Sequence, residues 1–162
     1  MENHALQEIV EAVVREMGVS SSINLESARA LSEQIRKRAS QIGVNAVVAV
    51  SDNAGNPILV ECMDNAFIAS YDIAVNKAFT VVSLKMSTSA LKPLAQPGGS
   101  LYGIQFTNGG KIVIFGGGEP LLNAKGDIIG GLGVSGGTEE QDTALAEYGK
   151  QIFEKGRIQN GY

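Results

Sequence analysis

Glycine is concentrated in the second half of this sequence, and this concentration limits how the chain can fold. All paired and tripled glycines lie beyond residue 97. Because glycine has no Cβ, such runs permit positive φ angles and close approach between backbone segments. We therefore predict tight strand ends and a pocket lined by backbone, rather than a flexible linker. The runs are Gly98-Gly99, Gly109-Gly110, Gly116-Gly117-Gly118, Gly130-Gly131 and Gly136-Gly137.

Apolar residues recur at helical spacing in several stretches. The first stretch is an amphipathic N-terminal segment, and a second helix begins at the N-cap residue Asn24 and closes at Gly43. A long helix carries apolar residues from 68 to 86, and a shorter helical piece follows over residues 87–96. The last helix opens with the capping box Thr-Glu-Glu-Gln at residues 138–141.

Strand patterns occur as two pairs. Residues 46–50 form a continuous apolar run, typical of a strand covered on both faces, and residues 57–63 return after a turn rich in Asn and Gly. A second pair is predicted over residues 111–115 and 127–134, separated by the turn 123–126. This order of elements predicts an α+β fold, with an antiparallel sheet and helices packed on it, not a Rossmann-type parallel sheet.

Charge and cysteine content exclude several classes of protein. The formal net charge is −4 and the pI is near 5.0, whereas nucleic-acid binding requires a concentrated basic face. The single cysteine, Cys62, cannot form an internal disulfide, which fits a reducing compartment. The N-terminus lacks the pattern of a secretory signal, and no segment is apolar enough to cross a bilayer. We predict a cytoplasmic protein with no nucleic-acid or membrane partner.

Five runs of residues, in this order, resemble a known family. The runs are Val48–Gly55, Asp72–Ala78, Ala95–Gly99, Gly116–Leu121 and Gly130–Asp142. On these runs the chain resembles the haem-binding, GlcG-like family. That family includes GlcG proteins of glycolate operons, a secreted haem-binding protein and the C-terminal domain of PduO-type adenosyltransferases. The resemblance implies a profilin-like fold, assembly into homo-oligomers and, in some members, binding of haem or a corrinoid-related ligand.

From the resemblance we expect a small-ligand-binding accessory protein linked to glycolate, glycerol or diol utilisation, with haem or a corrinoid as the ligand. Two alternatives stay open. One is an enzyme acting on a small hydroxy acid or aldehyde, and the other is a structural homo-oligomer or microcompartment component. No catalytic residue is identifiable in the sequence, which leans against the enzyme.

We divide the chain into an N-terminal amphipathic helix and linker, residues 1–22, and one domain, residues 23–162. The N-terminal helix resembles the short helices that dock enzymes into bacterial microcompartments, so a shell or enzyme partner is one hypothesis for it. The other is that it packs on its own domain or on another subunit.

We expect the ligand to lie against the glycine-rich strand ends, where bare backbone lets a flat ring approach. The helix motif adds Asp72 and Lys77, either as polar partners of a ligand or as an anchor between the helix and a neighbouring loop or subunit. The predicted ligand-binding residues are Asp72, Lys77, Gly117, Gly118, Pro120, Gly136 and Gly137.

Residues 131–136 read as G-x-G-x-x-G, but these glycines fall inside a predicted strand. We therefore interpret them as sites where the strand passes close to a helix or ligand, not as a dinucleotide fingerprint. Gly136-Gly137 before the last helix offers an anion nest, but Glu139 and Glu140 favour a structural cap there.

His4 is the only histidine in the sequence. An imidazole ligand to haem iron or another metal therefore has to be His4, although a residue so near the terminus is typical of an exposed surface. A site built from several histidines is excluded. We interpret Cys62, within an apolar strand, as a small buried hydrophobe.

Overall fold

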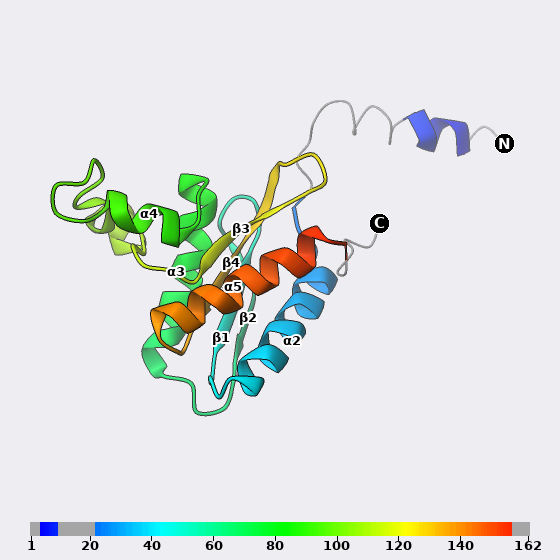
Figure 1. The fold of residues 1–162 in the computed structure, drawn as a ribbon. Coiled ribbons are helices and arrows are strands. Elements are labelled where there is room, and N and C mark those ends of the chain that lie inside the picture. The colour runs from blue at the N-terminus through cyan, green and yellow to red at the C-terminus, as the bar shows by residue number, and fades with distance from the viewer. Residues whose placement is uncertain (1–3, 10–21, 157–162) are drawn as a thin grey trace.

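The fold is a four-stranded antiparallel sheet with helices on both faces (Figure 1). This computed structural model describes residues 4–9 and 22–156. The strands follow the order β2-β1-β4-β3 across the sheet, and the prediction of an α+β fold is confirmed. The strands are β1 Val47–Ser51, β2 Pro57–Cys62, β3 Gly118–Leu122 and β4 Ile128–Ser135. The helices are α2 Leu25–Gln41, α3 Ile68–Leu84, α4 Thr88–Leu94 and α5 Glu139–Glu154, with short 3-10 turns η1 Ile104–Phe106 and η2 Asn108–Gly110.

The predicted N-terminal helix is described only in part. Residues 4–9 are helical, and residues 10–21 lie outside the described residues. The division of the chain after residue 22 and the docking role of this helix therefore stay predictions. Within the described ranges, every helix is too short or too polar to pass through a lipid bilayer.

Side-chain caps begin α2 and α5 where the sequence predicts them. Asn24 Oδ1 accepts a hydrogen bond from Ser27 N at 2.8 Å. At the start of α5, Thr138 Oγ1 accepts from Gln141 N at 3.2 Å, and Gln141 Oε1 accepts from Thr138 N at 2.9 Å. This reciprocal pair is the predicted capping box. By contrast, the N-cap residue of α3, Phe67, makes no side-chain cap hydrogen bond.

The two hairpin turns use the same local chemistry. Asp52 Oδ1 accepts from the backbone N–H groups of Ala54 at 2.9 Å and Asn56 at 2.8 Å. Asn123 Oδ1 accepts in the same way from Lys125 and Asp127, both at 2.9 Å. A short polar side chain thus closes each turn on its own backbone, which explains why both turns are readable from the sequence.

The strand predicted at residues 111–115 is wrong. Its place in the sheet is taken by β3, which begins three residues after the predicted strand ends and pairs with β4. Residues 111–113 are instead tied to α3 by side chains. Thr80 Oγ1 accepts from Val113 N at 3.0 Å and lies 3.3 Å from the Lys111 carbonyl oxygen, and Lys111 Nζ lies 5.4 Å from the centre of the Phe79 ring. An apolar run in the sequence predicts a strand, but it does not show whether the backbone binds a neighbouring strand or, as here, the side chain of Thr80.

Different helices cover the two faces of the sheet. Helices α2 and α5 lie side by side on one face, and α3 lies on the other (Figure 1). Branched side chains such as Leu31, Ile35 and Leu132 fill the α2–α5 face. On the α3 face, a Cβ added at Gly133 would overlap the carbonyl oxygen of Ala74, in the second turn of α3. Helix α3 therefore lies directly on the backbone of β4.

The outer strands, β2 and β3, each contain a proline. Pro57 is the first residue of β2, and Pro120 is the middle residue of β3. Proline has no N–H to donate and is tolerated at sheet edges for that reason. Cys62, the last residue of the edge strand β2, is exposed. The prediction of a buried Cys62 is wrong, because the apolar pattern does not reveal that β2 lies at an edge.

Candidate functional site

A cavity of about 280 Å³ opens where the start of α3 meets the turn from β4 into α5. Phe67, Ile73 and Phe115 supply its apolar walls. The other lining residues are Ala69, Ser70, Ser135, Gly136, Gly137, Glu139 and Asp142. Small-molecule sites combine apolar walls with a few placed polar groups, so this cavity is the candidate ligand site.

Lys77 lies behind the lining residues Asp142 and Phe115 and is fully buried. Its Nζ donates to the Val134 carbonyl oxygen at 2.8 Å and to Asp142 Oδ2 at 3.2 Å, and it stands 5.0 Å from the centre of the Phe115 ring. Burial lowers the pKa of Lys77, and the carboxylate of Asp142 opposes that shift. These contacts fit the anchor interpretation, because one ammonium group joins α3 to β4 and α5.

Asp142 connects this anchor to the turn that precedes α5. Its Oδ1 accepts from Gly137 N at 2.8 Å, while Oδ2 is paired with Lys77. The N–H of Gly137 is therefore directed to a protein carboxylate. The cap interpretation of Gly136-Gly137 fits this arrangement better than an anion nest does.

The chain that leads into β3 is held by one side chain from α5 and one from α4. Gly116 N donates to Glu139 Oε1 at 3.0 Å, and Gly118 N donates to Thr88 Oγ1 at 2.9 Å. Between them, Gly117 has a φ of 110°, and a Cβ there would lie 2.6 Å from Lys77 Nζ. Glycine at position 117 thus lets the chain pass over the buried ammonium group.

The structure separates Asp72 from Lys77. Asp72 is exposed and accepts from Asn76 Nδ2 at 3.2 Å on the same helix, whereas the carboxylate partner of Lys77 is Asp142. The alternative of an enzyme that uses Asp72 and Lys77 together therefore has no support from their placement.

The predicted glycines and proline fall into two groups. Gly136 and Gly137 line the cavity. Gly117, Gly118 and Pro120 do not line it and are buried against protein atoms. A Cβ at Gly118, for example, would lie 2.8 Å from Thr88 Cγ2. Their role as ligand contacts stays a prediction, while close packing accounts for the glycines.

Sequence reasoning missed most of the cavity lining. Phe67, Ser70, Phe115, Ser135 and Asp142 come from separate parts of the chain. Ser135 and Asp142 fall in the run Gly130–Asp142 that carries the family resemblance, and this was the only signal that could have singled them out.

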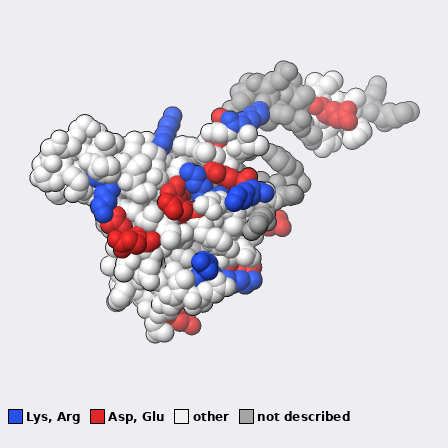
Figure 2. All heavy atoms as spheres, viewed as in Figure 1, with Lys and Arg blue, Asp and Glu red and all other residues white. Residues whose placement is uncertain are grey.

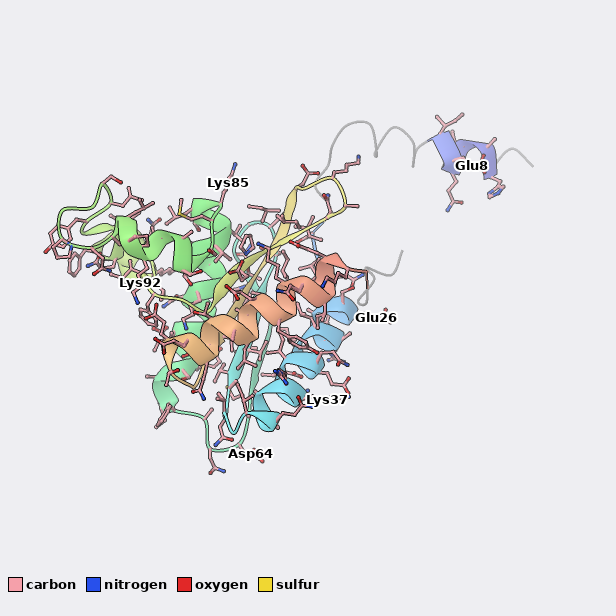
Figure 3. All side chains as sticks on the ribbon, viewed as in Figure 1. Glu8, Glu26, Lys37, Asp64, Lys85 and Lys92 are labelled. Carbon is pink, nitrogen blue, oxygen red and sulfur yellow. The ribbon has the colours of Figure 1, made fainter. Side chains whose placement is uncertain are left out.

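Glu139 forms the outer edge of the cavity. Its Oε1 accepts from Gly116 N, and its Oε2 accepts from Lys92 Nζ at 2.6 Å. The Gly116 N–H and then Lys92 lower the pKa of Glu139, so the side chain is ionised at neutral pH. Figure 3 shows Lys92 projecting from α4 toward the first turn of α5.

Charges of both signs are interspersed over α5 and its surroundings, and α4 with the following loop is largely uncharged on the same side (Figure 2). The face in this view has no concentrated basic patch of the kind that binds nucleic acid. Among the described residues, no group of three or more His, Cys, Asp and Glu side chains could hold a metal ion.

An exposed apolar surface adjoins the cavity at the start of α3. Phe67 is 72% exposed, Ile68 97% and Tyr71 53%. Tyr71 follows Phe67 by four residues, so the two rings lie on the same side of the helix start. Phe67 belongs to both features, because it also lines the cavity.

A haem group does not fit the cavity alone. The cavity is smaller than the roughly 300–1,000 Å³ of typical ligand pockets, and its lining contains no His, Cys, Met or Tyr to bind iron. The exposed surface of Phe67, Ile68 and Tyr71 fits better, since it offers apolar contact and a phenol oxygen. His4 is also exposed and lies 3.7 Å from Glu8, on a described segment separated from the domain by residues 10–21.

Sequence relatives cover nearly the whole domain. An uncharacterized 15.0 kDa protein in the dhaT-dhaS intergenic region of Citrobacter freundii is 44% identical over 133 residues, 82% of this chain and 93% of the relative. The corrinoid adenosyltransferase PduO of the same organism is 33% identical over 152 residues, 90% of this chain. The match spans only 45% of that PduO protein, so the activity of the whole enzyme does not follow for this chain.

Solved structures share the fold. Klebsiella pneumoniae protein ORFY, a DUF336 protein, superposes with a TM-score of 0.79 at 44% identity, covering 82% of this chain and 91% of ORFY. A PduOC:heme complex superposes with a TM-score of 0.78 at 33% identity, covering 87% of this chain and 99% of PduOC. The HbpS double mutant of Streptomyces reticuli superposes with a TM-score of 0.75 at 30% identity, covering 85% of this chain and 90% of the HbpS chain.

The model of one family, described as haem degrading protein HbpS-like, matches residues 23–151. This range includes the whole sheet and all the residues that line the cavity. The resemblance predicted from the five sequence runs is confirmed, and the chain belongs to the haem degrading protein HbpS-like family.

Proposed function

We propose that this chain is a small-ligand-binding accessory protein and that haem is the ligand its relatives best support. The observation that carries the proposal is the cavity at the start of α3 together with the exposed apolar surface beside it. Exposed aromatic and aliphatic side chains grouped in this way are typical of a binding surface.

The choice of haem is supported by relatives. The family is described as haem degrading, and one related structure at 33% identity is a haem complex. On this chain, Phe67 and Ile68 would provide apolar contacts to the macrocycle, and the phenol oxygen of Tyr71 would hold the iron. When bound, haem would supply an iron centre that the protein itself lacks.

The biological setting is supported less directly. One relative is named for the dhaT-dhaS intergenic region, and others are corrinoid adenosyltransferases. These names are in keeping with a corrinoid as the alternative ligand and with a link to glycerol or diol utilisation. Cytoplasmic location, a homo-oligomeric state and a microcompartment partner are part of the same proposal. The exposed free thiol of Cys62 supports a reducing compartment.

A haemin titration tests the proposal. We expect a saturable Soret band in the full-length protein at one haem per chain or per subunit pair. In Tyr71→Phe, which keeps the ring and removes the phenol oxygen, we expect a shifted Soret maximum and weaker binding. Tyr102→Phe is the matched control, because Tyr102 is also exposed but lies on the loop after α4.

Three results would contradict parts of this proposal. Absence of saturable binding would remove haem as the ligand. A spectrum unchanged in Tyr71→Phe but lost in His4→Ala would move the iron ligand to the N-terminal helix. Equal effects of the two tyrosine variants would show that the surface at the start of α3 is not the site.

A further inference from the structure

We infer that two copies of this chain pair through the outward side of α3, with the two α3 helices antiparallel. The side chains that would meet form a row on that side of the helix, named here the α3 stripe: Ile68, Tyr71, Val75, Phe79 and Val82. The inference goes beyond the proposed function, because it names the surface on which the copies meet and leaves the cavity aside. Only the effect of pairing on haem, given last, rests on the proposed function.

Helix α3 has its larger apolar side chains on the side turned away from the sheet. The residues that it buries are mostly small or polar, such as Ser70, Ala74 and Ala78. The stripe is 97% exposed at Ile68, 53% exposed at Tyr71 and partly exposed along the rest of its length. A helix with apolar residues on both sides is typical of one that is covered on both sides. The stripe is therefore expected to be covered by another surface.

The stripe extends well beyond the surface to which haem is assigned. From Ile68 to Val82 it is about 21 Å long, at 1.5 Å per residue. The proposed haem contacts occupy only the first turn of α3. The remaining stripe residues, Val75, Phe79 and Val82, need a partner that is as long as a helix.

The charge distribution favours α3 over the other helices as an interface. Helices α2 and α5 each contain six charged residues, whereas α3 contains only Asp72 and the buried Lys77. Lys85 ends α3, and Lys111 Nζ lies 5.4 Å from the centre of the Phe79 ring. The cores of protein interfaces are depleted of charged residues. Two copies that each carry a net charge of −4 repel each other least where the facing surfaces are nearly uncharged.

The spacing of the stripe makes it complementary to itself, which identifies the partner as a second copy. Successive stripe residues are three, four, four and three positions apart, so the row is symmetric about Val75. A twofold axis at Val75 would place Ile68 against Val82 of the second copy, and Tyr71 against Phe79 of the second copy. Aliphatic side chains then meet aliphatic ones, and each ring meets a ring. An isologous contact requires such self-complementarity, whereas contact with an unrelated helix does not.

Disulfide formation between copies tests the position of the axis. The background is Cys62→Ser, which removes the only native thiol. Val75→Cys places the new thiol on the axis, where the Cα atoms of the two copies come within the roughly 4.4–6.8 Å that a disulfide requires. We expect mild oxidation with diamide to convert most of this variant into covalent dimers on a non-reducing gel.

Ile68→Cys in the same background is the matched control. The axis separates the two copies of position 68 by about 21 Å, at 1.5 Å per residue, so we expect few covalent dimers. Random collision would favour the opposite result, because Ile68 is 97% exposed and Val75 is partly buried. The double variant Ile68→Cys/Val82→Cys brings two thiols together across the interface, and we expect it to form covalent dimers again.

Insertion of a charge tests the stripe without cross-linking. In sedimentation velocity of the haem-free full-length protein, we expect Val82→Glu to raise the dissociation constant of the pair at least tenfold, because the carboxylate would face an apolar surface. Ile9→Glu is the matched control in the N-terminal helix, where Ile9 is 60% exposed, and we expect no effect. Circular dichroism checks that both variants are folded.

Pairing also limits haem binding, and this consequence rests on the proposed function. Ile68 and Tyr71 belong to both surfaces, so a paired chain cannot offer them to the macrocycle. We expect the apparent haem affinity to fall as the protein concentration rises. At one fixed concentration, we expect Val82→Glu to bind haem about fivefold more tightly than the parent, since a larger fraction of its chains is unpaired.

Pairing through the stripe is overturned if the haem-free parent sediments as a single chain at all concentrations, or if Val82→Glu has no effect. It is also overturned if Val75→Cys and Ile68→Cys cross-link alike, or if Ile9→Glu dissociates the pair as Val82→Glu does, which would assign the stripe to the N-terminal helix. All these results are read without haem. A failed haemin titration therefore counts against the proposed function alone, and a haem affinity independent of protein concentration would overturn the shared use of Ile68 and Tyr71.

Discussion

The face of the sheet that carries α2 and α5 is filled by large side chains, whereas the face that carries α3 combines small side chains with close backbone contacts at β4. On the first face, apolar side chains from two helices interdigitate with those of β1 and β4. On the second, Gly131 and Gly133 of β4 bring the strand against the carbonyl oxygens of Ala78 and Ala74. The same strand therefore contributes a conventional core on one side and a bare surface on the other.

This difference determines where a site can form. Side chains that interdigitate can adjust when one of them changes, because rotamers move more readily than backbone. Backbone in direct contact with backbone cannot adjust in this way, so α3 is held in a single position. The candidate cavity lies at the start of this helix, where a fixed geometry would preserve the positions of its polar groups.

The largest effect in a comparison of the two faces is expected when one methyl group is added to the α3 face. Gly133→Ala places a Cβ where it overlaps the carbonyl oxygen of Ala74. We expect a loss of about 3 kcal/mol or more in the free energy of unfolding, because a helix has to move as a whole. Urea denaturation followed by circular dichroism measures it.

Gly149→Ala is the control on the opposite face. The added Cβ would lie 2.7 Å from the Cδ atoms of Ile35 and Leu132, which are the far ends of flexible side chains. Alanine also favours a helix over glycine by roughly 1 kcal/mol, so we expect a net change within about 1 kcal/mol. Similar losses in the two variants would break the distinction between the faces.

The second test removes the charged anchor of the α3 face. Lys77→Ala leaves the Asp142 carboxylate without its ammonium partner at a nearly dry site. We expect a loss of about 3 kcal/mol in the free energy of unfolding, since breaking a buried pair is much more costly than breaking an exposed one.

Lys37→Ala is the matched control for this variant. It breaks the exposed pair with Glu33 on α2, where we expect a change of about 0.5 kcal/mol or less. If Lys77→Ala costs no more than Lys37→Ala, Lys77 is not the anchor that joins α3 to β4 and α5.

The smallest effect is expected at the cavity edge, where the α3 face meets solvent. The pKa of Glu139 lies below its ordinary value of 4.5 in the folded protein. Its ionised form therefore stabilises the fold above about pH 4.5, and this contribution is lost as the pH falls through the folded-state pKa. We expect Glu139→Gln to lower Tm at pH 7 by about 2–4 °C at most, and the difference from the parent to shrink as the pH falls below 4.5.

Thermal melts of the parent, Glu139→Gln and Glu140→Gln between pH 7 and pH 3 measure this effect. A difference that persists unchanged at pH 3 would mean that the negative charge of Glu139 does not account for its contribution.

Features that depend on neighbouring residues were predictable from the sequence. Asn24 caps its own helix, Thr138 and Gln141 cap each other, and Asp52 and Asn123 close their own turns. In each case the interacting groups lie within four residues, so the pattern contains the whole interaction. The glycines of β4 were also interpreted correctly as sites of close approach, since few other roles suit glycine inside a strand.

Features that depend on distant residues were not predictable. Asp72 and Lys77 were predicted to act together from the helix motif, but the carboxylate that binds Lys77 belongs to Asp142, 65 residues further along the chain. The apolar run at residues 111–115 was read as a strand, although it is bound to the side chain of Thr80. Neither the partner of a buried charge nor the edge position of a strand leaves a periodic signal.

The two prolines in the outer strands have a consequence for how copies of this protein can meet. An edge strand with free N–H groups can add a strand from a neighbouring molecule and so continue the sheet indefinitely. Pro57 and Pro120 remove a donor from β2 and from β3, so both ends of the sheet resist such growth. Copies of the chain that associate are therefore expected to meet through helices and loops, and not by extending the sheet.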